Sequence, residues 1–242
     1  MDTRTNERPA VLNHLTTTQM MELFSQFDDG DRPSFDEHVA SYGLDRGTGS
    51  RIWDWFSADP TGDLKVPVSA DDHVRGRNDA PATLVVYGDY QCPYTRRALQ
   101  AITRLERRIG DRFRLVYRHF PLREVHPHAE AAAELAEAAA DRGRFWEMHD
   151  RLFHRQDDLD PYHLAAHAAD FGIPAAEFGI PDKGDDPGHF EAGSRYADRV
   201  EEDVQGGIRS GVDETPAVYV NGRRHRAGYD EATLQRAIEL AR

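Results

Sequence analysis

Apolar residues follow two different periods along this chain, and together these periods predict an α/β protein. Residues 83–87 are a short apolar, β-branched run that is typical of a buried strand. In residues 94–109 apolar positions recur every three or four residues, which predicts a helix with one buried face. Residues 112–119 alternate apolar and charged side chains, so they predict a second strand, parallel to the first and joined to it by a βαβ crossover.

The rest of the chain is predicted to be mostly helical, with one hairpin near its end. Thr16 with Gln19, and Ser34 with Glu37, have the spacing of capping boxes at helix starts. Asn221-Gly222 is a typical hairpin turn between strands at 217–221 and 223–227. Residues 172–188, rich in proline and glycine, are expected to form a loop. The predicted helices cover residues 16–28, 34–42, 48–57, 128–141, 145–153, 161–171, 189–209 and 230–241.

These elements fall into two parts. Residues 1–57 predict a small helical module, for which packing on the main domain or a dimer contact is the expected role. Residues 58–72 hold two prolines and few large apolar groups, so we interpret them as a linker. Residues 73–242 then form the main domain.

Composition narrows the possible partners. The chain has 242 residues and a net charge of −13, and an acidic surface repels phosphate backbones, so nucleic acid is not an expected partner. No apolar run reaches the length that spans a membrane, and a membrane is not an expected partner either. The first thirty residues lack a signal-like apolar core, which makes the cytoplasm the expected location.

The most informative residue is the single cysteine, Cys92, between the strand at 83–87 and the helix at 94–109. Pro93 suits the first turn of a helix, and the positive end of the helix dipole there favours a thiolate over a thiol. A lone cysteine can also be an inert small apolar residue. Its place at a strand-to-helix junction favours the reactive thiol, and with one cysteine no intrachain disulfide can form.

Five separated motifs resemble the DsbA-like branch of the thioredoxin superfamily over about residues 73–242. They are YGDYQCPY, RHFPL, HPHA, RFWEMHDRLF and SGVDETPAVYVNG. The resemblance implies a thioredoxin fold with a helical subdomain inserted at about 126–188. It also implies that Thr215-Pro216 has a cis peptide bond, lies against Cys92 and leaves the backbone before it free to pair with a substrate peptide.

The sequence departs from this family at one position: the family's pattern Cys-Pro-Tyr-Cys ends here in Thr95. A mixed disulfide at Cys92 must then be released by a thiol from another molecule. We therefore expect a monothiol thiol-disulfide oxidoreductase that acts on protein disulfides or thiol adducts, with a low-molecular-weight thiol as co-substrate and no bound cofactor. The alternatives are a thiol-dependent transferase or isomerase of the glutathione type, and a redox-inactive peptide-binding or chaperone module.

The residues around the cysteine have expected roles of their own. Cys92, Thr95 and Pro216 are the candidate catalytic residues; Thr215, Tyr94, Pro93 and Tyr90 are candidates for contacts with substrate. Thr95 either donates a hydrogen bond to the sulfur or bonds the backbone of its own helix turn. Asp89 is expected to cap the loop or helix at Cys92, with proton relay as the alternative.

Twelve histidines raise the question of a metal site, since His163 and His167 are one helical turn apart and four others fall within 126–154. No cysteine is spare as a ligand and no His-Glu-x-x-His pattern occurs, so no metal site is predicted.

Overall fold

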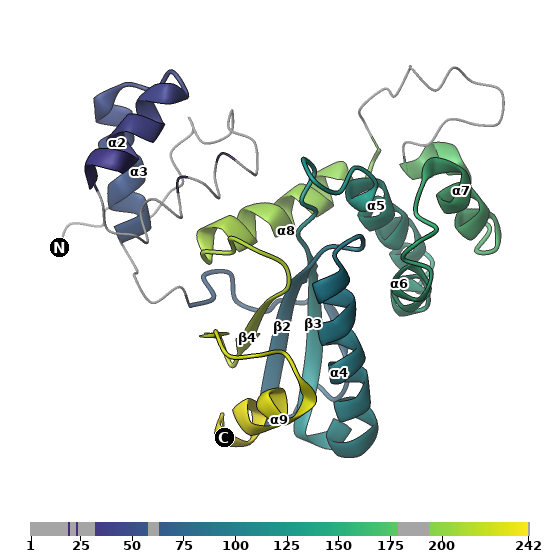
Figure 1. Ribbon diagram of the computed structural model, residues 1–242. Helices are drawn as coiled ribbons and strands as arrows, with labels where there is room; N and C mark the ends of the chain where they lie inside the picture. Colours follow the sequence, from purple (N-terminus) through teal and green to yellow (C-terminus); the bar gives the residue numbers. More distant parts are fainter. Residues whose placement is uncertain (1–18, 20–22, 24–31, 58–62, 179–193, 242) are drawn as a thin grey trace.

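A five-stranded sheet forms the centre of the molecule (Figure 1). The computed structural model describes residues 19, 23, 32–57, 63–178 and 194–241. The strand order in the sheet is β1-β3-β2-β4-β5, with β2 and β3 parallel and the other neighbouring pairs antiparallel. The strands are β1 His73–Arg75, β2 Ala82–Gly88, β3 Phe113–His119, β4 Ala217–Val220 and β5 Arg223–His225. The predicted strands and the parallel crossover are therefore confirmed.

The central strands are buried on both faces, which explains the continuous apolar run of β2 from Leu84 to Tyr87. Leu84 and Val86 belong to one apolar cluster, whereas Val85 and Tyr87 belong to a second cluster across the sheet. Side chains of a strand alternate between its faces, so a strand covered on both sides needs apolar residues at successive positions.

Helices cover both faces of the sheet. α4 (Pro93–Ile109) runs from the end of β2 to β3 and packs with α9 (Glu231–Leu240) in the first cluster (Figure 1). α8 (Ala197–Arg209) contributes Val204 and Ile208 to the second cluster on the opposite face. Between β3 and α8 the chain forms the helical insertion, with α5 Ala129–Ala140, α6 Phe145–His154, α7 Pro161–Ala169 and the short 3₁₀ helix η3 Ala175–Phe178; a further 3₁₀ turn, η2 Gly110–Arg112, follows α4.

Beyond shifts of one or two residues at element ends, two predicted segments differ from the structure. The helix predicted for 189–209 begins only at Ala197, because the Ser194 hydroxyl oxygen accepts a hydrogen bond from the Tyr196 N–H and holds that stretch in a turn. The part of this helix predicted before residue 194 lies outside the described residues. The predicted loop at 172–188 contains η3, while its remainder from 179 onward also lies outside them.

Within residues 32–57, the continuously described part of the N-terminal region, the chain forms α2 (Arg32–Ser41) and α3 (Arg46–Ser57), close to the predicted ranges. Their residues Phe35, Val39 and Ile52 belong to the second apolar cluster. The predicted helix at 16–28 and its Thr16 cap lie outside the described residues, apart from residues 19 and 23. No helix among the described residues has the length and apolar character needed to cross a membrane.

The described part of the predicted linker, residues 63–72, is bound to the main domain. The Arg118 guanidinium donates to Asp72 at 2.7 Å and to the carbonyl oxygens of Val66 and Pro67. The Arg118–Asp72 ion pair is almost fully buried, and the Leu64 N–H donates to Gly222 O at 2.8 Å. This stretch therefore packs as part of the domain, through long-range contacts that its composition does not reveal.

Gly207 lets α8 approach the aromatic residues beneath it. A Cβ added at Gly207 would lie 2.6 Å from Cδ2 of Phe120 and 3.1 Å from Cδ1 of Tyr87. By contrast, a Cβ added at Gly110 has no neighbour within 4 Å.

We predict that Gly207→Ala lowers the free energy of unfolding although alanine is the better helix former. Overpacking costs about 1–3 kcal/mol, which exceeds the gain in helix propensity of about 1 kcal/mol. Urea unfolding followed by circular dichroism measures the change. Gly110→Ala is the matched control and should be neutral or slightly stabilising; equal effects of both substitutions would contradict this packing account.

A second prediction concerns Glu134 of α5, which is only 8% exposed. Burial, with a smaller effect of Glu130, raises the pKa of Glu134 to about 7. The unfolded value is about 4.3, so between these values the native chain holds a proton that the unfolded chain has lost, and stability falls as pH rises through this window.

Glu134→Gln removes this titration. We expect the substitution to stabilise the protein by about 1–2 kcal/mol at pH 8 and to have little effect at pH 4, after discounting the shift for partial solvent access. Urea unfolding of both proteins across this pH range measures the difference. A difference that does not change with pH would contradict the assignment.

Candidate active site

Cys92 lies at the N-terminus of α4, directly against the loop that precedes β4. Its Sγ donates a hydrogen bond to the Thr215 carbonyl oxygen at 3.2 Å, and the Thr215-Pro216 peptide bond is cis. Both features agree with what the resemblance implies. Cys92 is 3% exposed, and its sulfur faces a backbone carbonyl. The Thr215 Oγ1 is also buried and has no hydrogen-bond partner within the described parts of the chain.

The sulfur does not cap its helix. Cys92 is the N-cap residue, with an extended backbone, and Pro93 occupies the first helical position as predicted. However, the Cys92 side chain accepts no capping hydrogen bond from the helix backbone. Any influence of α4 on the sulfur is therefore that of the helix dipole and not of a direct N–H contact.

Asp89 organises the loop that carries the cysteine. Its carboxylate accepts hydrogen bonds from the N–H groups of Gln91 at 2.7 Å, Cys92 at 3.2 Å and Leu122 at 2.7 Å. It also bonds His126 Nδ1 at 2.8 Å. Four partners around a carboxylate that is 2% exposed fit the predicted capping role.

Thr95 is fully buried, and its hydroxyl contacts the loop that precedes its own helix. Its hydroxyl oxygen accepts a long hydrogen bond of 3.5 Å from the Asp89 N–H. Among the described residues it makes no hydrogen bond with Cys92 or with the backbone of its own helix turn, so its backbone partner lies in the loop before α4. A Cβ on Gly88 would lie 2.8 Å from Thr95 Cγ2 and 2.7 Å from Cε2 of Tyr117, which explains the glycine here.

The three predicted substrate contacts next to the cysteine separate into two groups. Pro93 and Tyr94 are exposed, Tyr94 at 63%, and they form the outer surface at the start of α4. The prediction for Tyr90 is wrong, because its ring is 1% exposed and packs 4.7 Å from Phe153. Its hydroxyl is hydrogen-bonded to His149 Nδ1 at 3.1 Å, so it supports the loop from beneath.

The Tyr90–His149 pair that supports the loop is uncharged. Burial raises the pKa of Tyr90 well above the usual tyrosine value, and burial lowers the pKa of His149 well below the usual histidine value. Both side chains are therefore neutral near pH 7, as an apolar core requires.

Gln156 is a site residue that sequence reasoning missed. Its side-chain amide donates to the carbonyl oxygens of Tyr90 at 2.7 Å and Cys92 at 3.0 Å. It follows α6 in the helical insertion and fixes the cysteine loop from that side. No periodicity or motif distinguishes Gln156 in the sequence.

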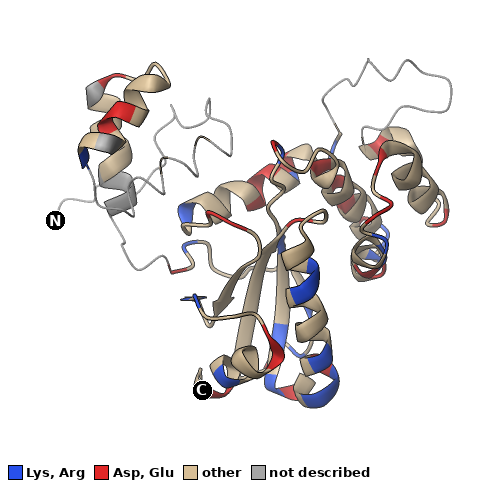
Figure 2. Ribbon diagram, in the orientation of Figure 1, with Lys and Arg blue, Asp and Glu red and all other residues tan. Residues whose placement is uncertain are grey.

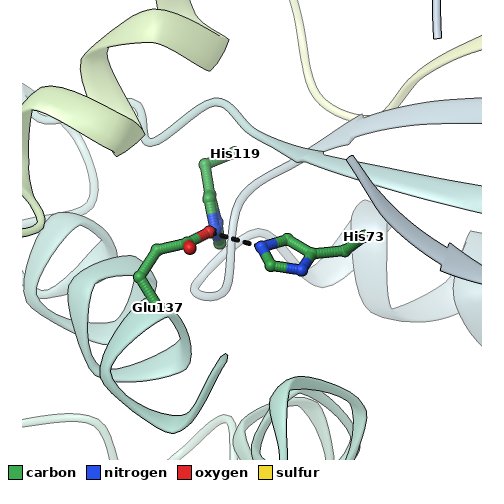
Figure 3. A group of neighbouring side chains, drawn as sticks. All are labelled: His73, His119 and Glu137. Atoms are coloured by element: carbon green, nitrogen blue, oxygen red, sulfur yellow. Dashed lines mark hydrogen bonds and ion pairs between the residues drawn. The ribbon is translucent and has the colours of Figure 1, made fainter. Parts of the chain in front are cut away.

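A second polar cluster joins β1, β3 and α5. The Nε2 atoms of His73 and His119 both lie 2.7 Å from Glu137 Oε1 (Figure 3). Burial alone would raise the pKa of Glu137, but hydrogen bonds from His119 and His73 outweigh it and hold the pKa well below its usual value. Two imidazoles and a carboxylate are a ligand set that zinc accepts. The observed distances are those of hydrogen bonds, and we describe the group as a polar tie between the sheet and the insertion.

The histidines considered from the sequence have other partners. His126 bonds Asp89, His149 bonds Tyr90, and His163 bonds Asp160 at 2.5 Å. None of these three belongs to the group of possible metal ligands found among the described residues. The sequence did not indicate the contact between His73 and Glu137, because 64 positions separate the two residues.

Three solved structures illustrate the fold to which this chain is similar. BdbD from Bacillus subtilis has a TM-score of 0.55 at 20% identity, with 76% of this chain and 94% of that chain covered. The catalytic domain of ScsC from Proteus mirabilis has a TM-score of 0.58 at 15% identity, with 76% and 95% covered. α-DsbA1 from Wolbachia pipientis has a TM-score of 0.55 at 18% identity, with 75% and 95% covered. The DsbA-like thioredoxin fold is thereby confirmed.

Curated relatives have a higher sequence identity to this chain, but the similarity covers only part of their own length. The chain is 41% identical over 195 residues to a protein named Na(+)/H(+) antiporter NhaA 1 from Mycolicibacterium gilvum, covering 79% of this chain and 30% of that protein. It is 43% identical over 180 residues to a protein of the same name from Salinispora arenicola, covering 74% and 26%. The chain therefore spans less than a third of these relatives.

A family model described as thioredoxin matches residues 69–240, which is most of the chain and includes both Cys92 and Thr215-Pro216. On this match, the chain belongs to the thioredoxin family.

Proposed function

We propose that this protein is a monothiol thiol-disulfide oxidoreductase that exchanges disulfides through Cys92. The observation that carries the proposal is the contact of the Cys92 sulfur with Thr215 O at 3.2 Å, beside the cis Thr215-Pro216 bond. On this proposal, the only cysteine of the chain lies where an extended peptide pairs with the backbone before Pro216. An inert buried cysteine would need neither neighbour.

The exchange has two balanced steps. The Cys92 thiolate attacks one sulfur of a substrate disulfide, a new S–S bond to Cys92 forms, and the other substrate sulfur leaves as a thiolate. A thiolate from a second molecule then attacks the substrate sulfur of this mixed disulfide. The Cys92 thiolate is released, and the net result is exchange of one thiol for another without net oxidation.

Thr95 makes the second molecule necessary. The family's second cysteine would release the mixed disulfide from within the chain, but the hydroxyl of Thr95 cannot form a disulfide. A low-molecular-weight thiol is the proposed co-substrate, and protein disulfides or protein thiol adducts are the proposed substrates.

The nearly enclosed sulfur limits how a substrate approaches. We propose that the substrate backbone lies along Thr215-Pro216 while its side chains meet the exposed Pro93 and Tyr94. Approach over this edge displaces the hydrogen bond from Cys92 to Thr215 O, which frees both the sulfur and that carbonyl oxygen for the incoming chain. Ion transport is not carried over from the names of the relatives, because the match covers under a third of them.

The first test of this function is removal of glutathione from a glutathionylated model protein, with excess glutathione as the co-substrate. We expect turnover that depends on Cys92 and that Cys92→Ala abolishes. Thiol release followed by mass spectrometry gives the rate. A rate unchanged in Cys92→Ala would contradict the proposal, and binding of the model protein without turnover would support the peptide-binding alternative.

The second test changes the site from monothiol to dithiol chemistry by a substitution at position 95. Each protein first reacts with glutathione disulfide, which is the oxidant, and the excess reagent is removed. Thr95→Cys restores the family's dithiol pattern, so the introduced thiol should displace glutathione from Cys92 and form an intrachain disulfide. The wild type and Thr95→Ser, the matched control, should stop after one mixed disulfide per chain. Thiol titration and mass spectrometry distinguish the two end states, and loss of the glutathione adduct by Thr95→Ser without any added thiol would rule out the assigned role of position 95.

A further inference from the structure

A groove between α4 and α6 begins one helical turn after Cys92. Its volume is about 510 Å³, and its lining includes Arg96, Leu99, Thr103 and Arg107 from α4. Phe153 of α6 lines it from the other side. These α4 positions repeat every three to four residues after Cys92, so the groove continues the helix face that begins at the cysteine.

The charge of this groove is opposite to that of the whole protein. The chain carries a net charge of −13, yet the described residues that line the groove include four arginines and a single acidic residue, Asp150. Figure 2 shows that basic residues recur from the first turn of α4 to its end. Two of the four arginines are neutralised: Arg75 pairs with Glu106 and Asp150, and Arg104 pairs with Glu231.

Arg96 and Arg107 are the two remaining cations. Within the described parts of the chain, neither side chain has an ion pair or a hydrogen bond with another side chain. Arg96 is partly buried at the end of the groove near Cys92, and Arg107 is exposed at the far end. The buried side chains of Leu99 and Phe153 lie between these two ends.

The length of the groove indicates the kind of ligand. Arg107 comes eleven positions after Arg96 in α4, which corresponds to about 16 Å along a helix. An extended peptide of about five residues has the same length. A small thiol with its sulfur at Cys92 reaches only the near end, so the two free cations together fit an extended anionic chain.

We propose that this groove binds an acidic, extended segment of the protein on which Cys92 acts. The carboxylates of the segment pair with Arg96 and Arg107, and its apolar side chains cover Leu99 and Phe153. The inference rests on the proposed exchange at Cys92, since it names the class of protein substrate. Protein substrates are then selected by the acidic residues next to their reacting sulfur, because Arg96 and Arg107 repel basic segments.

The test measures binding and exchange separately. Binding of a labelled ten-residue peptide of Asp, Glu and Leu without cysteine is followed by fluorescence anisotropy, beside the same peptide with Asn and Gln in place of the acids. We expect the acidic peptide to bind the full chain about ten-fold more tightly at low salt, and this preference to shrink as salt screens the charges. The double variant Arg96→Ala with Arg107→Ala should lose the preference.

The matched control removes the same charge elsewhere. Arg226→Ala with Arg236→Ala takes away two exposed arginines outside the groove and should keep the preference. Circular dichroism establishes that both double variants are folded. Equal binding of the two peptides, or equal loss of the preference in both double variants, would overturn the proposal.

A second readout separates this inference from the proposed function. Each peptide is extended by one cysteine, carried as its glutathione mixed disulfide, and the kcat/KM of exchange is compared. Preferential binding of the acidic peptide with no exchange at all supports the groove and refutes the exchange at Cys92. Equal exchange of both peptides without any difference in binding refutes the groove and leaves the exchange standing. If the Arg96 and Arg107 substitutions slow only the attack of glutathione on the Cys92 adduct, the groove serves the small thiol and the proposal is wrong.

Discussion

The arrangement depends on one contact between two distant parts of the chain. Cys92 Sγ meets Thr215 O across 123 positions, and the contact joins the start of α4 to the loop before β4. Pairing of β2 with β4 brings the two segments together, because Tyr87 lies opposite Ala217 in the sheet. The sulfur is thus placed by sheet register, and the carbonyl that it meets belongs to the cis Thr215-Pro216 bond.

The loop that holds the sulfur is fixed from several sides by polar groups rather than by apolar packing alone. The Asp89 carboxylate accepts hydrogen bonds from the N–H groups of the loop, and the Gln156 amide donates to the carbonyl oxygens of Tyr90 and Cys92. Buried polar groups cost free energy unless they are paired, so each of these bonds helps specify one loop conformation. The helical insertion therefore has a structural task at the site, since Gln156 comes from it.

Sequence patterns predicted most of the fold because its elements are locally encoded. The apolar run of β2, the spacing of α4 and the Asn221-Gly222 turn each carry their own signal, and Asn221 and Gly222 have the positive φ angles, 48° and 82°, that such a turn needs. The place of Cys92 beside Thr215-Pro216 followed from the family resemblance. The burial of Tyr90 was missed because a tyrosine next to a loop cysteine has the same local pattern whether it faces solvent or α6.

What sequence reasoning could not supply are contacts between distant residues that have no motif. The hydrogen bonds of Glu137 with His73 and His119 depend on how the insertion docks on the sheet, as do those of Gln156. The cationic groove depends on the ion pairs that neutralise Arg75 and Arg104 and leave Arg96 and Arg107 free among the described side chains. A count of charges along the chain gives only the net value of −13 and does not show that this groove is positively charged.

The central claim is that the nearly enclosed Cys92 sulfur is open to exchange with thiols from outside the chain. The most direct measurement mixes the native protein with glutathione disulfide and follows its intact mass over time. The account predicts a single adduct of one glutathione per chain, located on Cys92, formed without unfolding and reversed by added thiol. A native protein that stays unmodified, and reacts only after denaturant exposes the sulfur, would contradict it.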